Sequence, residues 1–141
     1  EGSTTNSIEL SGLVPSDTPY QYTFNVNNFS ANHDRTNTNL TYTIKFTTTT
    51  NLPLTFEIVR NEAYAAGATN IITNESVTQD SNGVYYKNMS NDATYSFGFV
   101  SNQTDYYILV VNFPSQYKNN SDEYQSLIDL FTITIDAKQV V

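Results

Sequence analysis

Large apolar and small polar residues alternate with a period of two along most of the chain, and this pattern limits the fold more than any other feature. In residues 20–28, Tyr, Phe and Val lie on one face and Gln, Thr and Asn on the other. Such alternation is typical of a strand with one buried and one solvated face. It recurs in residues 40–47, 54–60 and 131–137. We expect the strands at 20–28 and 40–47 to be antiparallel neighbours.

Turn residues and a longer apolar run locate further strands. Asp80-Ser81-Asn82-Gly83 separates two short strands, and its Asn-Gly pair supplies the positive φ angles of a tight hairpin turn. Residues 95–99 alternate again, whereas residues 106–111 are apolar enough for a central strand that is buried on both faces. Residues 122–125 are a candidate helical turn.

The chain of 141 residues therefore describes an all-β fold, a two-sheet antiparallel β-sandwich of jelly-roll or immunoglobulin-like type with eight or nine strands. Its length fits one domain, which we place at residues 10–141. Residues 1–9 are an N-terminal segment that is either flexible or a donor strand. The predicted core consists of inward-facing apolar residues, namely Tyr22, Phe24, Val26, Tyr42, Ile44, Phe46, Phe56, Ile58, Phe97, Phe99, Ile108, Val110, Phe131, Ile133 and Ile135.

The composition excludes several classes of function. A net charge of −8 repels a phosphate backbone or an anionic membrane surface, so we expect no nucleic-acid partner and no membrane-surface partner. The absence of cysteine excludes disulfides, thiolate metal sites and cysteine nucleophiles. No apolar run approaches the roughly 20 residues of a membrane span, so no membrane span is predicted.

One histidine, His33, lies beside Asp34 in a polar loop, where it is a candidate metal ligand or general base. Because the chain offers no second imidazole and no thiolate, we interpret His33 as a solvated loop residue. The 14 acidic residues offer no distinct pair for glycoside hydrolysis. We therefore predict that the protein is not an enzyme and has no catalytic residues.

Two groups of oxygen-bearing side chains are candidates for calcium binding. One group combines Asp122 and Glu123 with Asp129, and the other combines Asp80 with Asn82. Neither group has the spacing of an EF-hand loop, so we interpret them as turn-forming residues that face solvent. We predict no metal-binding residues, no cofactor-binding residues and no cofactor.

Two tyrosine pairs, Tyr85-Tyr86 and Tyr106-Tyr107, are candidates for stacking on the sugar rings of a glycan partner. Adjacent residues of a strand point to opposite faces, so one ring of each pair leaves the core unless both faces are covered. A flat row of exposed rings would indicate stacking on sugars. Scattered rings would be an ordinary surface.

Three pieces of the sequence form a larger pattern. The first is Leu10-Ser11, then Leu13-Val14-Pro15-Ser16-Asp17 and the strand pattern Tyr22-x-Phe24-x-Val26-x-Asn28. The second is Leu40-Thr41-Tyr42-x-Ile44 with Leu52-Pro53-Leu54, and the third is Asp129-x-Phe131-x-Ile133-x-Ile135-Asp136-Ala137-x-Gln139. Together they resemble the TasA/camelysin family of secreted proteins, which build fibres in the biofilm matrix of Gram-positive bacteria.

This resemblance implies a jelly-roll-like sandwich, export with cleavage of a leader, and self-assembly by strand addition. In such assembly the N-terminal segment of one subunit completes the sheet of the next, which needs an unpaired strand edge. Residues 1–9 would be the donor. We therefore expect a secreted structural or interaction protein at the bacterial cell surface or in the extracellular matrix, as a fibre subunit or an accessory to one.

Two alternatives remain open. The chain could be a carbohydrate-binding or adhesin module of a bacterial cell-surface protein, with a glycan as its partner. It could also be one domain of a larger surface protein.

Overall fold

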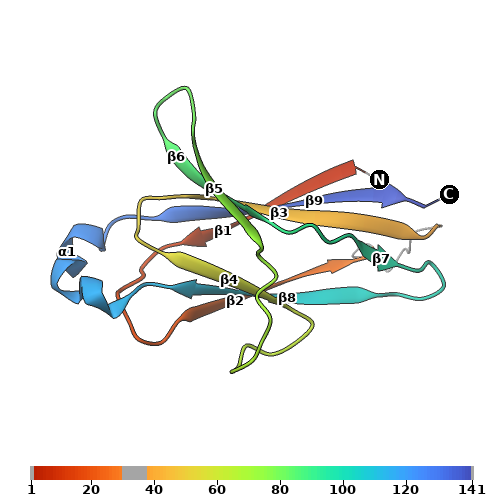
Figure 1. Ribbon diagram of the computed structural model, residues 1–141, viewed down its shortest axis with the longest axis horizontal. Helices are drawn as coiled ribbons and strands as arrows, with labels where there is room; N and C mark the ends of the chain where they lie inside the picture. Colours follow the sequence, from red (N-terminus) through yellow and green to blue (C-terminus); the bar gives the residue numbers. More distant parts are fainter. Residues whose placement is uncertain (1, 30–37, 141) are drawn as a thin grey trace.

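The computed structural model describes residues 2–29 and 38–140, which form nine strands in two antiparallel sheets (Figure 1). The six-stranded sheet has the order β1 (Gly2–Leu10), β9 (Asp129–Gln139), β3 (Leu40–Thr49), β6 (Tyr85–Ser90) and β5 (Asn74–Gln79), with β7 (Tyr95–Phe97) paired to one end of β3. The three-stranded sheet has the order β2 (Tyr20–Asn27), β8 (Thr104–Asn112) and β4 (Thr55–Arg60). The predicted all-β, two-sheet antiparallel sandwich is confirmed.

The core lies between the two sheets and is rich in aromatic rings. Strand β3 shows how the alternation builds it, because its even-numbered residues are buried and its odd-numbered residues face outward. Phe131 of β9 joins the two layers, with its ring centroid 5.7 Å from that of Phe46 in the same sheet and 5.3 Å from that of Phe56 in the other. Aromatic pairs at this spacing add to the free energy gained by burying their area.

Most of the predicted core residues are buried or pack against the core. One is wrong, because Phe99 is 44% exposed. The alternation predicted a strand through Phe99, but β7 ends at Phe97. The chain leaves the sheet there because the Asn28 amide donates to the Gly98 carbonyl at 2.8 Å, and the Asn39 side chain accepts from the Phe99 N–H at 3.1 Å. Ile108, also predicted, is only partly buried.

The predicted pairing of residues 20–28 with residues 40–47 is also wrong. Strand β2 pairs with β8 in the three-stranded sheet, whereas β3 pairs with β9, β6 and β7 in the six-stranded sheet. The alternation fixes which side chains face the core, but it does not choose a partner strand. The two strands therefore lie in different layers.

Strand β8 is central in the three-stranded sheet, as its continuous apolar run predicted, but it is buried on both faces only over residues 109–111, because Tyr106 is 64% exposed. Leu109 and Val111 face the six-stranded sheet, while Val110 is buried on the opposite face. The free edge of the neighbouring strand β4 is covered by the segment that follows it. Asn70 accepts from the Ile58 N–H at 3.0 Å, and the Ile71 N–H donates to the Ile58 carbonyl at 2.8 Å.

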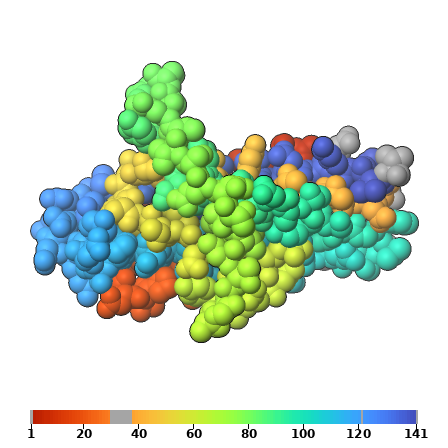
Figure 2. Space-filling view, viewed as in Figure 1, coloured from red at the N-terminus to blue at the C-terminus, as the bar shows by residue number. Residues whose placement is uncertain are grey.

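The predicted hairpin is formed by β5 and β6, and it stands out from the body of the sandwich (Figure 2). Gly83 has a φ of 81°, a left-handed conformation that glycine adopts without strain. The Asp80 carboxylate accepts from the N–H groups of Asn82 and Val84 at 2.8 and 3.0 Å. Asp80 is therefore a turn residue, as the sequence indicated.

Two short helices close one end of the sandwich. They are the 3-10 helix Ser115–Asn120 and α1 (Ser121–Tyr124), which includes part of the predicted helical turn. Their aromatic residues Tyr117 and Tyr124 pack against Phe113, which follows β8. Neither helix has the length and apolar character needed to cross a membrane.

The buried face of β9 gives a first testable prediction. Ile133 is 3% exposed, so replacing it with alanine removes buried methyl groups and leaves a cavity. We expect Ile133→Ala to lower the free energy of unfolding by about 2–5 kcal/mol in urea denaturation. The matched control is Ile128→Ala, at a residue that is 47% exposed, for which we expect a change within about 0.5 kcal/mol. Equal losses for the two variants would contradict this assignment of the core.

Candidate functional site

The N-terminal strand β1 is an edge strand held by a single neighbour. It pairs with β9 from Gly2 opposite Ala137 to Leu10 opposite Asp129. No other strand of the described residues pairs with it. The sequence left two alternatives for the N-terminal segment, a flexible segment or a donor strand. In the structure, residues 2–10 are paired within their own chain. Residue 1 lies outside the described residues.

The first six residues of β1 do not enter the core. Residues 2–7 are all exposed, and only Leu10 at the other end of the strand is fully buried. The reason is in the sequence, because Thr4 and Asn6 occupy the positions opposite Ile135 and Ile133, where apolar residues would face the core. This half of the strand is therefore held by backbone hydrogen bonds and by a few hydroxyl contacts, such as Ser7 Oγ to Thr132 Oγ1 at 3.2 Å.

A partly apolar cleft lies between the sheets beside β1. It has a volume of about 260 Å³, and its lining residues come from β1, β2, β3, β7 and β9, namely Thr4, Asn6, Asn25, Val26, Asn27, Leu40, Tyr42, Phe97, Ile135 and Ala137. Strand β2 is an edge of the three-stranded sheet, with no second partner among the described strands. Two strand edges that can accept or donate backbone hydrogen bonds thus flank this cleft.

Deeper between the sheets, a hydrogen-bonded cluster joins three strands. The Tyr42 hydroxyl of β3 lies 2.5 Å from the Asp105 carboxylate and 2.5 Å from the Tyr107 hydroxyl, both of β8. Arg60 at the end of β4 donates to the same carboxylate at 2.9 Å, and the Asn61 amide donates to its other oxygen at 3.1 Å. The cluster fastens the six-stranded sheet to the three-stranded one.

The protonation states of this cluster are fixed by its surroundings. Burial acts to raise the pKa of Asp105, but hydrogen bonds from Tyr42, Asn61 and Arg60 and the charge of Arg60 outweigh it and lower that pKa below its ordinary value. Burial raises the pKa of Tyr107 to about 12, against the lowering effect of the Tyr42 hydrogen bond and of Arg60. The pKa of Tyr42 is raised chiefly by burial and by its hydrogen bond to Asp105. These groups therefore keep one charge state through the neutral range, as suits a structural link between sheets.

A second buried carboxylate, Asp129, lies at the start of β9. It accepts from the Thr49 hydroxyl at 2.6 Å and from the N–H groups of Asn51 and Leu52 at 2.8 and 2.9 Å. The interpretation of Asp129 as a solvent-facing residue is therefore wrong. It is 1% exposed, because it satisfies the backbone of the connection between β3 and β4.

The other candidate ligands remain apart. Asp122 and Glu123 are exposed on α1, away from the buried Asp129. Within residues 2–29 and 38–140, no three His, Cys, Asp or Glu side chains lie close enough together to hold a metal ion. His33 and Asp34 lie outside the described residues.

One ring of each tyrosine pair is exposed, as predicted, but only the pair in β8 places its other ring in the core. Tyr107 is buried and Tyr86 is half-buried, whereas Tyr85 is 54% exposed and Tyr106 is 64% exposed. The two exposed rings belong to β6 and β8, in different sheets. They therefore do not form one flat row.

Arg60, Asn61 and Asp105 are site residues that were not predicted from the sequence. A signal was present, because Asp105 directly precedes the apolar run of β8 and Arg60 ends the apolar strand β4. A charged residue within such a segment is buried only with a partner.

Comparisons of the chain with protein families, with curated protein sequences and with solved structures found no significant match.

The Asp105 cluster predicts a particular dependence of stability on pH. A carboxylate whose pKa is lower in the folded chain stabilises it above the unfolded pKa of about 3.9, and this contribution is lost as the pH falls through the folded pKa. We expect Asp105→Asn to lower the free energy of unfolding by about 3 kcal/mol at pH 7, because it leaves Arg60 without its carboxylate partner. The loss relative to the wild type should shrink as the pH falls below about 4.

Urea denaturation across this pH range provides the measurement. Asp122→Asn is the control, because Asp122 is exposed on α1, and we expect it to change the free energy of unfolding by less than about 0.5 kcal/mol. A loss for Asp105→Asn that is the same at every pH would refute the assigned role of the carboxylate.

Proposed function

We propose that the chain is a secreted, non-enzymatic structural protein that assembles through strand β1, as a subunit of an extracellular-matrix or biofilm fibre or as an accessory to one. The observation that carries this proposal is an edge strand whose first six residues are exposed and whose only partner among the described strands is β9. The resemblance to the TasA/camelysin family supports the same role.

Exchange of β1 between copies is favoured because the contacts formed between two chains are the same as those broken within one chain. When β1 leaves, the edge of β9 loses its backbone partners over nine residue pairs. The β1 strand of a second copy restores the same hydrogen bonds and returns Ile8 and Leu10 to the same positions. The net free energy of the exchange therefore consists of the free energy of association and of any conformational change in the hinge, as in domain swapping.

A hinge for this exchange follows directly after β1. Gly12 has a φ of 67°, in the left-handed region that glycine adopts without strain. A change of conformation at this residue extends the chain and carries β1 away from its own β9. The connection is anchored again at Leu13, which is buried, and at Val14, whose N–H donates to the Tyr20 hydroxyl at 3.0 Å.

Every copy has both a donor and an acceptor. Its β1 strand leaves toward the next subunit, while its β9 edge receives the strand of the previous one. A head-to-tail contact of this kind that does not close generates an open filament. The net charge of −8 opposes the approach of copies at low salt and is screened at physiological ionic strength, where the Debye length is about 8 Å. Assembly should therefore increase with salt.

The proposal predicts that assembly requires the N-terminal strand. In analytical ultracentrifugation at physiological salt, we expect the full chain to form long species as its concentration rises. A chain lacking residues 1–9 keeps the acceptor edge but has no donor, so it should stay monomeric, with circular dichroism as the control for its fold.

A synthetic peptide of residues 1–10, added in excess to the full chain, should compete for the β9 edge and shorten the assemblies. A full chain that remains monomeric at every concentration would reject the proposal. So would a truncated chain that assembles as well as the full one.

A further inference from the structure

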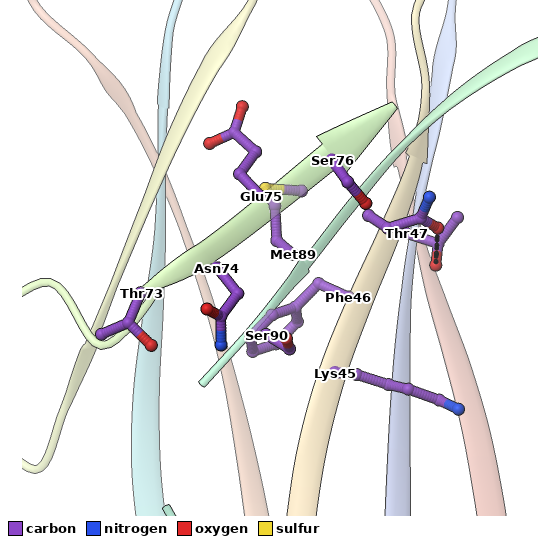
Figure 3. A pocket seen from close by; sticks show the side chains of 10 residues that line it. Lys45, Phe46, Thr47, Thr73, Asn74, Glu75, Ser76, Met89 and Ser90 are labelled. Carbon is purple, nitrogen blue, oxygen red and sulfur yellow. Dashed lines mark hydrogen bonds between the residues drawn. The ribbon is translucent and has the colours of Figure 1, made fainter. Parts of the chain in front are cut away.

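The outer face of the six-stranded sheet is hollowed where the β5–β6 hairpin meets β3 (Figure 3). This groove has a volume of about 510 Å³, within the range of small-ligand sites. Its lining residues come from the three neighbouring strands β3, β6 and β5 and from Thr73, the residue before β5.

The strand register sorts these residues into rows. Two rows point outward, and they consist of Lys45, Ser90 and Asn74 in one and of Thr47, Asn88 and Ser76 in the other. The row between them contains Phe46 and Met89, whose side chains are buried in the core. The middle row therefore supplies the backbone floor of the groove, and the outer rows supply its hydroxyl, amide and ammonium groups.

Two charged residues, Glu75 and Lys45, line the groove, and only Glu75 has an ion-pair partner among the described residues. Glu75 lies on the opposite face of β5, where it pairs with Lys87 at 3.3 Å, and Figure 3 shows its side chain pointing away from Lys45. Lys45 has no ion-pair partner within the described part of the chain. The groove thus carries one free ammonium among five neutral polar side chains of its outer rows.

Two amides of the groove are already oriented by neighbours. Asn88 donates to the Thr78 hydroxyl at 2.9 Å and accepts from the Thr47 hydroxyl at 3.4 Å. Asn74 donates to the Asp92 carboxylate at 3.1 Å. Each amide keeps a second N–H and a free acceptor position. Groups fixed in this way lose less conformational entropy when a ligand binds.

We propose that this groove binds a neutral oligosaccharide. The outer rows offer hydroxyl and amide groups that both donate and accept, as the hydroxyls of a sugar do. They lack the exposed apolar and aromatic core that a protein partner needs, and the net charge of −8 disfavours polyanions. Tyr86 lies on the same outer face of β6, two residues from Asn88, and its half-buried ring offers a surface for a sugar ring.

This site is independent of assembly through β1. Strands β5 and β1 are opposite edges of the six-stranded sheet, so the groove is present in the monomer and in an assembled chain alike. Repetition of a weak site along a filament would raise its avidity for a polysaccharide. The inference therefore goes beyond the proposed structural role, and it can fail or succeed separately.

The test uses the full chain at a concentration where it is monomeric, on an array of neutral and uronic-acid-containing oligosaccharides of four to six sugars. Neutral oligosaccharides that bind are then titrated by isothermal calorimetry. We expect Asn88→Ala to weaken binding at least tenfold. Ser76→Tyr, at an exposed position of β5, fills the groove and should abolish binding, and thermal unfolding checks that both variants fold.

Thr43→Ala is the matched control, because Thr43 is exposed on the same outer face of β3 but does not line the groove. It should keep its affinity within twofold. Three outcomes would overturn the proposal: no neutral oligosaccharide binds, only the acidic ones bind, or Ser76→Tyr binds as well as the wild type.

Discussion

The pairing of β9 on both of its edges is the interaction on which the rest of the structure depends. Strand β9 is hydrogen-bonded to β3 on one side and to β1 on the other, and its inward residues Phe131, Ile133 and Ile135 are buried in the core. The N-terminal strand has no other neighbour among the described strands. Its place in the fold is thus decided by the last strand of the chain, whose edge cannot distinguish its own β1 from that of another copy.

The N-terminal strand is held less firmly than the body of the sandwich. Buried carboxylates fasten the body of the sandwich, with Asp105 linking the sheets and Asp129 holding the connection between β3 and β4. By contrast, residues 2–7 of β1 are exposed. A weakly buried donor favours strand exchange, because residues 2–7 can leave with little change to the core and only Leu10 gives up a fully buried position.

The sequence predicts the strands better than their arrangement. The period-two alternation and the Asn82-Gly83 pair are local signals, and they located the strands and the hairpin. The choice between sheets depends on partners that are distant in the sequence, so the predicted pairing of residues 20–28 with residues 40–47 was wrong. The exposure of Phe99 follows from hydrogen bonds made by Asn28, some 70 residues away along the chain.

The candidate site was predictable only in part. The sequence identified the N-terminal segment, but its pairing with β9 joins the two ends of the chain and has no local signal. The Asp105 cluster depends on Tyr42 and Arg60, which come from other strands. The groove between β3, β6 and β5 likewise arises from the register of three strands, so no single segment of the sequence reveals it.

A cysteine pair across β1 and β9 tests the central claim most directly. The hydroxyl oxygens of Ser7 and Thr132 are 3.2 Å apart, and the chain has no cysteine of its own. The double variant Ser7→Cys, Thr132→Cys is assembled under reducing conditions, oxidised, and separated on a denaturing gel without reductant. Strand exchange predicts a ladder of covalently linked chains, whereas oxidation of the dilute monomer before assembly should lock β1 in place and prevent growth. Assemblies that yield only single chains after oxidation would contradict the account.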